Sequence, residues 1–203
     1  MIGADGTVQS LGRCLVGAVV ASCLVLIVGC QRATTKSYTA VLPNVQLVDD
    51  HGSPVALGSL NGKLVLLDFI HIGCPGVCTS LTNKLGQVAD GLGPVLGSKV
   101  VLLTITNDPE HDNPRQLLSL ARSSEADLNG WYFVTGNPSN VDRVIKAFGL
   151  NNDPLPDGSH NHITKVFLLG PDGREQREYQ GLVMDSRAVI AEIRATLTRE
   201  GIS

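Results

Sequence analysis

The chain alternates between short, fully apolar runs and longer amphipathic stretches. Residues Leu64 to Ile70 and Val100 to Ile105 form runs with almost no polar position. Such runs are typical of central strands whose two faces are both covered. Between them, residues 79–92 carry leucine and valine at spacings of four, three and four, which is the period of an amphipathic helix. The pattern therefore predicts a strand, a helix and a second strand in succession.

The same alternation continues to the end of the chain. Three further stretches with helical spacing or helix-start signals predict helices over 114–123, 139–148 and about 185–198. Five short runs bounded by turn signals predict strands over 45–48, 55–57, 131–134, 163–169 and 174–179. A βαβ unit followed by an antiparallel hairpin and a closing helix is the element order of a thioredoxin-like domain. We therefore predict an α/β thioredoxin-like fold over residues 44–203, with an N-terminal β-hairpin extension.

The first 29 residues differ in composition from the rest. Arg13 precedes sixteen residues without charge, which is the layout of the basic flank and apolar core of an export signal. A permanent membrane helix needs roughly 20 apolar residues, so the length favours cleavage. The run ends Ile-Val-Gly-Cys30, which resembles a bacterial lipobox. We therefore expect a lipoprotein signal peptide at 1–29, lipidation of Cys30 and a polar tether over 30–43, with a retained N-terminal helix as the alternative.

Either arrangement places the domain outside the cytoplasm. We expect a protein of the bacterial cell envelope, held at the membrane by its N-terminal lipid, with the domain facing the periplasm or the exterior. The 203 residues include 16 basic and 19 acidic ones, a net charge of -3, without the basic stripe that binds phosphate backbones. The charge balance therefore argues against nucleic acid as a partner.

Two cysteines, Cys74 and Cys78, remain as free thiols once Cys30 carries lipid and the signal peptide is removed. Neighbouring cysteines outside the cytoplasm tend to oxidise unless a metal or a reductant protects them. Both lie directly after the predicted central strand, at the expected start of a helix, where the helix dipole lowers the pKa of a thiol. A spacing of four places both sulfurs on one helical face, where they can meet one small ion or join as a disulfide.

The kinds of ligand narrow the choice of metal. Thiolate pairs select Cu(I), Zn(II) or iron–sulfur clusters. Structural zinc usually has four protein ligands and clusters usually four cysteines, whereas two cysteines and one imidazole suit three-coordinate Cu(I). The candidates for that imidazole are His71, His160 and His162, because His51 and His111 fall in other predicted loops. Sequence spacing does not choose among the three.

Several motifs together resemble the SCO/SenC family in their order and spacing. They are Cys74-Pro-Gly-Val-Cys78, the segment Asp108-Pro-Glu-His-Asp112, and His162 four residues before a strand that ends in Pro-Asp-Gly. The resemblance covers roughly residues 44 to 200. It implies a thioredoxin-like domain in which Cys74, Cys78 and His162 bind copper, as Cu(I) or Cu(II).

The resemblance also implies partners. A member of this family supplies copper to, or matures, the CuA site of cytochrome c oxidase, so the oxidase subunit that carries CuA is the expected partner. Other periplasmic copper chaperones and thiol reductants are further expected partners. Family resemblance places the 108–112 loop near the metal without defining a chemical role for it. For His71, which ends the central strand, we expect a packing or supporting role.

Two other functions are consistent with cysteines in such a fold. One is an exported thiol–disulfide oxidoreductase acting on the oxidase or on other envelope proteins, in which one thiolate attacks and the other resolves. Whether the protein is an enzyme therefore depends on which hypothesis holds. The other is a thiol peroxidase, which needs a threonine or serine three residues before its reactive cysteine. His71 and Pro75 occupy those positions before Cys74 and Cys78, so that motif is absent.

Overall fold

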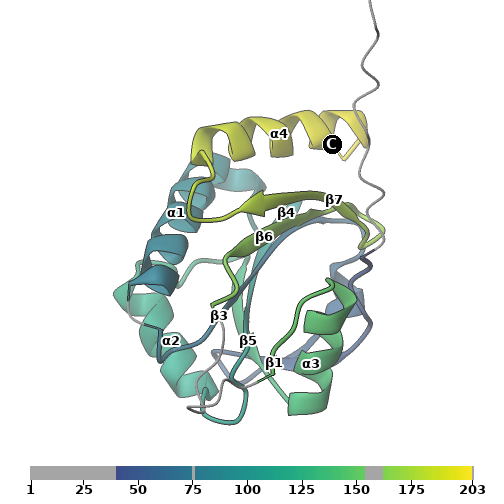
Figure 1. The fold of residues 1–203 in the computed structure, drawn as a ribbon. Helices are drawn as coiled ribbons and strands as arrows, with labels where there is room; N and C mark the ends of the chain where they lie inside the picture. Colours follow the sequence, from purple (N-terminus) through teal and green to yellow (C-terminus); the bar gives the residue numbers. More distant parts are fainter. Residues whose placement is uncertain (1–39, 75, 154–161, 203) are drawn as a thin grey trace, which may run out of the picture. The chain divides into compact units, whose positions relative to one another are not determined.

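One seven-stranded sheet organises the part of the chain that the structure describes (Figure 1). In this computed structural model that part comprises residues 40–74, 76–153 and 162–202. Its strands, in the order in which they lie side by side, are β2 (Pro54–Ala56), β1 (Gln46–Asp49), β5 (Trp131–Thr135), β4 (Val100–Thr106), β3 (Leu64–Ile70), β6 (Lys165–Leu169) and β7 (Glu175–Gln180). The helices are α1 (Val77–Leu92), α2 (Pro114–Ser123), α3 (Pro138–Ala147) and α4 (Ser186–Arg199), with 3-10 turns η1 (Leu57–Leu60) and η2 (Gly93–Val95).

The middle of the sheet is parallel and its flanks are antiparallel. β3 pairs in parallel with β4, and β4 with β5, so β3, α1 and β4 form the predicted βαβ unit. β6 runs antiparallel to β3, and β7 antiparallel to β6. β1 pairs with β2 and also with β5, so the N-terminal hairpin extends the sheet. The predicted thioredoxin-like α/β fold is confirmed.

Alternate residues of the central strands separate the core into two layers. Leu66 and Ile70 of β3 pack with the buried faces of α1, α2 and α4. Leu67 and Phe69 point to the opposite face and pack with α3 and the N-terminal hairpin. Figure 1 shows α1 and α4 beside each other and α3 on the other side of the sheet. Because both faces are covered, all seven residues of β3 are buried.

The N-terminal boundary of the folded part lies earlier than expected. Residues 40–43, assigned above to the tether, lie against the β6–β7 turn. The Leu42 N–H donates to the Gly173 carbonyl at 2.9 Å, and the Glu175 N–H donates to the Ala40 carbonyl at 3.0 Å. Backbone pairing of this kind orders the segment. The folded domain therefore includes residue 40.

The predictions on the first thirty residues concern a part of the chain outside the described residues. The signal peptide over 1–29, the lipidation of Cys30 and most of the tether fall there. Within the ranges that are described, no helix combines the length and the apolar character needed to cross a bilayer.

A buried carboxylate lies between β3 and β4. Asp68 is 1 % exposed, and its Oδ1 accepts a hydrogen bond from the Thr104 hydroxyl at 2.6 Å. The Trp131 indole N–H donates to the same hydroxyl oxygen at 2.9 Å. Among the described side chains, Oδ2 of Asp68 is the buried polar atom without a hydrogen-bond partner. Burial raises the pKa of Asp68 from 3.8 to about 7, against the opposing effect of the Thr104 hydrogen bond.

The raised pKa of Asp68 predicts that the reduced, metal-free protein loses stability as pH rises from about 4 to about 7. Below this interval the carboxyl is protonated in both states, and within it only the unfolded state ionises, which lowers the free energy of unfolding by up to about 4 kcal/mol. Urea unfolding at several pH values should show this slope in the wild type and a shallower one in Asp68→Asn, where the raised pKa values of Asp50 and Asp112 still contribute. The exposed carboxylate of α1 offers a matched control, Asp90→Asn, which should keep the slope. An unchanged slope in Asp68→Asn would assign the titration to another group.

Candidate metal centre

The two cysteines lie where β3 gives way to α1. β3 ends at Ile70, the chain turns, and α1 begins at Val77. The Cys74 N–H donates to the His71 carbonyl at 3.2 Å, which closes the turn. Both cysteines are free thiols, and Cys74 and Cys78 are only 3 % and 7 % exposed. The site is therefore built at the carboxyl end of the central strand.

A turn, and not one helical face, brings the two sulfurs together. Cys74 precedes the helix, so the expectation that both cysteines occupy one helical face is wrong. Gly76 stands at the helix N-cap with φ of +91°, a backbone conformation that residues with a Cβ rarely adopt. This conformation starts α1 at Val77, two residues before the predicted start, and places Cys78 in its first turn.

His162 reaches the cysteines through the pairing of β6 with β3. Asp68 lies opposite Val166 in this antiparallel ladder. Continuing the same register outward brings His162 level with Ile72, two residues before Cys74. His162 Nδ1 lies 2.9 Å from the Cys74 sulfur, within hydrogen-bond distance. The structure thus brings together the three residues that the resemblance singled out.

His71, for which a packing or supporting role is expected from the sequence, also lies in this cluster. One ligand atom from each of His71, Cys74, Cys78 and His162 lies within 4.8 Å of every other. The rings of His71 and His162 are nearly parallel, at 10°, with centroids 5.3 Å apart. His71 is 8 % exposed, whereas the side chain of His162 is exposed. Two sulfurs and two imidazoles therefore line one small site.

Burial dominates the protonation of Cys78. Desolvation raises the pKa of this thiol above its ordinary value, and the neighbouring Cys74 raises it further. A hydrogen bond from the backbone of His71 lowers it, with a smaller effect. The lowered pKa expected from the helix dipole is therefore wrong for Cys78, because the loss of water outweighs the dipole. Metal binding at this site has to displace the thiol proton.

The other histidines lie elsewhere or outside the described residues. His51 Nε2 is 3.2 Å from Asp127 Oδ1 and, together with Asp50, forms a separate cluster of potential ligands. His111 pairs with Asp108 at 2.8 Å, and its side chain is 75 % exposed. His160, the first rival of His162, lies outside the described residues.

Asp112 anchors the cysteine turn, a role that sequence analysis missed. Its Oδ2 accepts the Ile72 N–H at 3.1 Å and also the Thr106 hydroxyl. The Thr135 hydroxyl donates to the Asp112 carbonyl at 3.0 Å. Asp112 is 5 % exposed, so from a buried position its carboxylate holds the turn to β4, while its backbone carbonyl bonds to β5. Its place at the end of the 108–112 motif was the available signal, although the sequence does not show which backbone group it binds.

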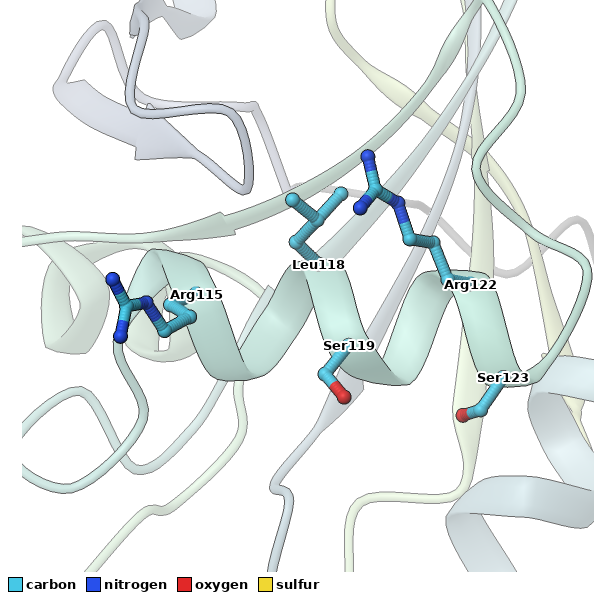
Figure 2. Close-up of a pocket in the computed structure, with 5 residues that line it drawn as sticks. All are labelled: Arg115, Leu118, Ser119, Arg122 and Ser123. Atoms are coloured by element: carbon cyan, nitrogen blue, oxygen red, sulfur yellow. The ribbon is translucent and has the colours of Figure 1, made fainter.

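A surface hollow lies along α2, and its lining differs from that of the cysteine–histidine cluster (Figure 2). It is lined by Arg115, Leu118, Ser119, Arg122 and Ser123. Arg122 is paired with Asp127 at 3.1 Å. None of these lining residues carries a thiol, imidazole or carboxylate ligand. This hollow therefore offers no set of metal ligands, in contrast to the cluster at the end of β3.

Comparison with known proteins identifies the family. The SCO1/SenC family model matches residues 33–198. A relative from Stutzerimonas stutzeri carries the name putative copper-binding protein. It is 30% identical over 136 residues, which cover 65% of each chain. The SCO1 homolog of Bacillus subtilis is 29% identical over 134 residues, 64% of this chain and 69% of the relative. The fission-yeast protein sco1 is 27% identical, and the match spans 50% of its length.

Solved structures agree with the fold. A SCO1/SenC family lipoprotein from Bacillus anthracis superposes with a TM-score of 0.70 at 21% identity, over 78% of this chain and 95% of that one. Bradyrhizobium japonicum ScoI, solved with copper bound, gives a TM-score of 0.66 at 26% identity, over 78% and 100%. Fold and site together define a thioredoxin-like domain with a cysteine–histidine centre. The chain belongs to the SCO1/SenC family, so the resemblance seen in its motifs is confirmed.

The anchoring role of Asp112 predicts a local effect at the cysteine turn. Asp112→Ala leaves the Ile72 N–H without its acceptor, which should lower the free energy of unfolding by about 1–3 kcal/mol. Hydrogen exchange should show faster exchange of the Ile72 amide. The exposed Glu110→Ala, in the same loop, serves as control and should change neither quantity. Unchanged protection of the Ile72 amide in Asp112→Ala would contradict the anchoring role.

Proposed function

We propose that the protein is a copper chaperone that holds copper at Cys74, Cys78 and His162 and delivers it to the CuA-carrying subunit of cytochrome c oxidase. The observation that carries the proposal is the convergence of two sulfurs and an imidazole, from segments 88 residues apart, at a Cys74 Sγ to His162 Nδ1 distance of 2.9 Å. Among the relatives, the Stutzerimonas stutzeri protein is named for copper binding, and the Bradyrhizobium japonicum protein was solved with copper bound. A further structural neighbour, BsSco, is a member of the Sco family of cytochrome c oxidase assembly proteins.

The dimensions of the cluster fit a single ion. Bonds of about 2.3 Å to thiolate sulfur and about 2.0 Å to imidazole nitrogen place ligand atoms on opposite sides of an ion at most about 4.6 Å apart. The ligand atoms here lie within 4.8 Å of one another, so small side-chain adjustments close the site. Two soft sulfurs with imidazole nitrogen suit copper, the metal for which the Stutzerimonas stutzeri relative is named.

The exposure of the ligands fits transfer to a partner. Cys74 and Cys78 are buried, whereas His162 faces solvent. A partner ligand can therefore displace the imidazole first and reach the sulfurs afterwards. Buried thiolates bind the ion away from water and from competing small thiols until this exchange begins. Other periplasmic copper chaperones and thiol reductants are the further partners that this chemistry requires, the first to load the site and the second to keep the cysteines reduced.

Copper binding is tested by anaerobic Cu(I) titration of the full chain in detergent, in competition with a chromophoric chelator. The wild type should bind about one Cu(I) per chain, because the two thiolates and one imidazole complete a three-coordinate site. Cys74→Ser and Cys78→Ser should abolish tight binding. His162→Ala should weaken it by about 10–100-fold, and His111→Ala, which removes an exposed imidazole outside the cluster, should leave it unchanged. Wild-type affinity in His162→Ala would remove this histidine from the site.

A thiol–disulfide oxidoreductase is the second candidate function, favoured by two free thiols that lie together in one cluster. In that function one thiolate attacks a partner disulfide and the other resolves the mixed disulfide. The reaction needs both cysteines and does not need an imidazole ligand. Disulfide reduction that survives His162→Ala and copper chelation would favour this function over the chaperone.

Envelope anchoring completes the proposal. We infer a signal peptide over 1–29, lipid on Cys30 and a tether toward the domain, which together hold the protein at the membrane of the bacterial envelope. The apolar run that ends at Cys30 supports this arrangement, and one structural neighbour is a lipoprotein of Bacillus anthracis. A membrane-held carrier stays near a membrane-embedded oxidase, which shortens the search for its target.

Lipidation is tested in a bacterial host that processes lipoproteins, by metabolic labelling with a fatty acid. The wild type should incorporate label and sediment with membranes, because acyl chains give the mature protein its membrane affinity. Cys30→Ala should lose both properties, whereas Cys23→Ala, within the apolar run, should keep them. Label retained in Cys30→Ala would show that another residue carries the lipid.

A further inference from the structure

His71 occupies the fourth position of the cluster and is fixed there by its neighbours. Its carbonyl accepts the Cys74 N–H at 3.2 Å, and its backbone also hydrogen-bonds the Cys78 thiol. Its ring stacks on that of His162 with centroids 5.3 Å apart. The side chain is 8 % exposed and follows directly after the buried strand β3. His71 is therefore in contact with all three proposed copper ligands, through main chain or side chain.

We propose that His71 is a fourth ligand, which the protein uses for Cu(II) and not for Cu(I). The proposal rests on the copper site of the proposed function and deepens it. With His71 included, the site presents two sulfurs and two nitrogens, a set that suits both oxidation states of copper.

Cu(I) and Cu(II) differ in the number and kind of ligands that they prefer. Cu(I) has no preference for four ligands and is satisfied by two thiolates and one imidazole, whereas Cu(II) favours tetragonal sites that include nitrogen or oxygen. A three-ligand set leaves Cu(II) short of one donor in its plane. Among the described residues, the cluster around Cys74 contains no aspartate or glutamate. The imidazole of His71 is the donor of this cluster that can fill the remaining position.

The spacing of one ligand pair matches a right angle at the metal. For metal–ligand bonds of about 2.3 Å and about 2.0 Å, sulfur and nitrogen lie about 3.0 Å apart at a right angle and about 3.5 Å apart at a tetrahedral angle. The Cys74 Sγ to His162 Nδ1 distance of 2.9 Å matches the right angle. The four ligand atoms all lie within 4.8 Å of one another, a limit that planar and tetrahedral sites both satisfy. Cys74 and His162 are therefore spaced like neighbouring ligands of a tetragonal Cu(II) site.

A second cluster requires a control in any Cu(II) experiment. Asp50, His51 and Asp127 also bring ligand atoms within 4.8 Å of one another, and two of these three residues are exposed. Such a group of carboxylates and imidazole can bind Cu(II) without sulfur. Its contribution is recognised by the absence of a sulfur-to-copper charge-transfer band and by sensitivity to His51→Ala.

The test adds one equivalent of Cu(II) anaerobically to the reduced full chain, with thiol counting to show that both cysteines stay reduced. Electron paramagnetic resonance and visible absorption then report the ligands. In the wild type we expect sulfur-to-copper charge transfer and coupling to two nitrogens. His71→Phe keeps a stacked ring and removes the nitrogen, so coupling should fall to one nitrogen and the Cu(II) affinity by about 10–100-fold. His51→Ala and His111→Ala should leave the spectrum unchanged.

Cu(I) titration of the same variants separates this proposal from the proposed function. His71→Phe should bind Cu(I) within about threefold of the wild type, because the three other ligands remain. A wild type that fails to bind Cu(I) overturns the chaperone itself. A wild type that binds Cu(I) while its Cu(II) spectrum shows one coupled nitrogen overturns only the role of His71, and this measurement does not depend on any variant folding. Unaltered Cu(II) coupling and affinity in folded His71→Phe, or in His71→Gln, overturns it equally.

Discussion

The site depends on the antiparallel pairing of β6 with β3. β3 ends in the turn that holds both cysteines, and β6 begins three residues after His162. The ladder that joins Asp68 to Val166 brings these two segments together although 88 residues separate Cys74 from His162. Because β3 is buried on both faces and also paired with β4, this end of the strand has little freedom to move. The geometry of the cluster is therefore inherited from the core of the sheet.

Much of the fold could be predicted from local patterns. Apolar runs identified the central strands, and the helical period over 79–92 identified α1. The start of α1 was harder to predict, because it depends on the positive φ of Gly76 and on where the turn before the helix closes. Sequence spacing could not predict which histidine lies beside the cysteines, since this depends on the register between strands that are distant in the sequence. The family resemblance supplied His162, and the pairing of β6 with β3 gives the physical reason.

His71 and Asp68 show two further limits of sequence analysis. Alternation along β3 sends Ile70 toward α1 and would send the next residue to the opposite layer, so His71 was expected to pack. The strand ends at Ile70, and the turn rotates His71 back toward the sulfurs. Asp68 stands in an apolar run, and the sequence does not show that its carboxylate is fully covered, with one oxygen unpaired. Both features arise from tertiary structure, where a turn or a covering layer overrides the local pattern.

The position of His162 constrains the number of residues between it and β6. Side chains of a strand alternate between its two faces, and Val166 and Leu168 face the layer that contains Cys74 and Cys78. His162 is separated from them by even numbers of residues, which matches its place on the same side. Inserting or deleting one residue before Val166 would shift this parity and turn the imidazole away. Homologous chains with the same site should therefore keep three residues between this histidine and the position of Val166.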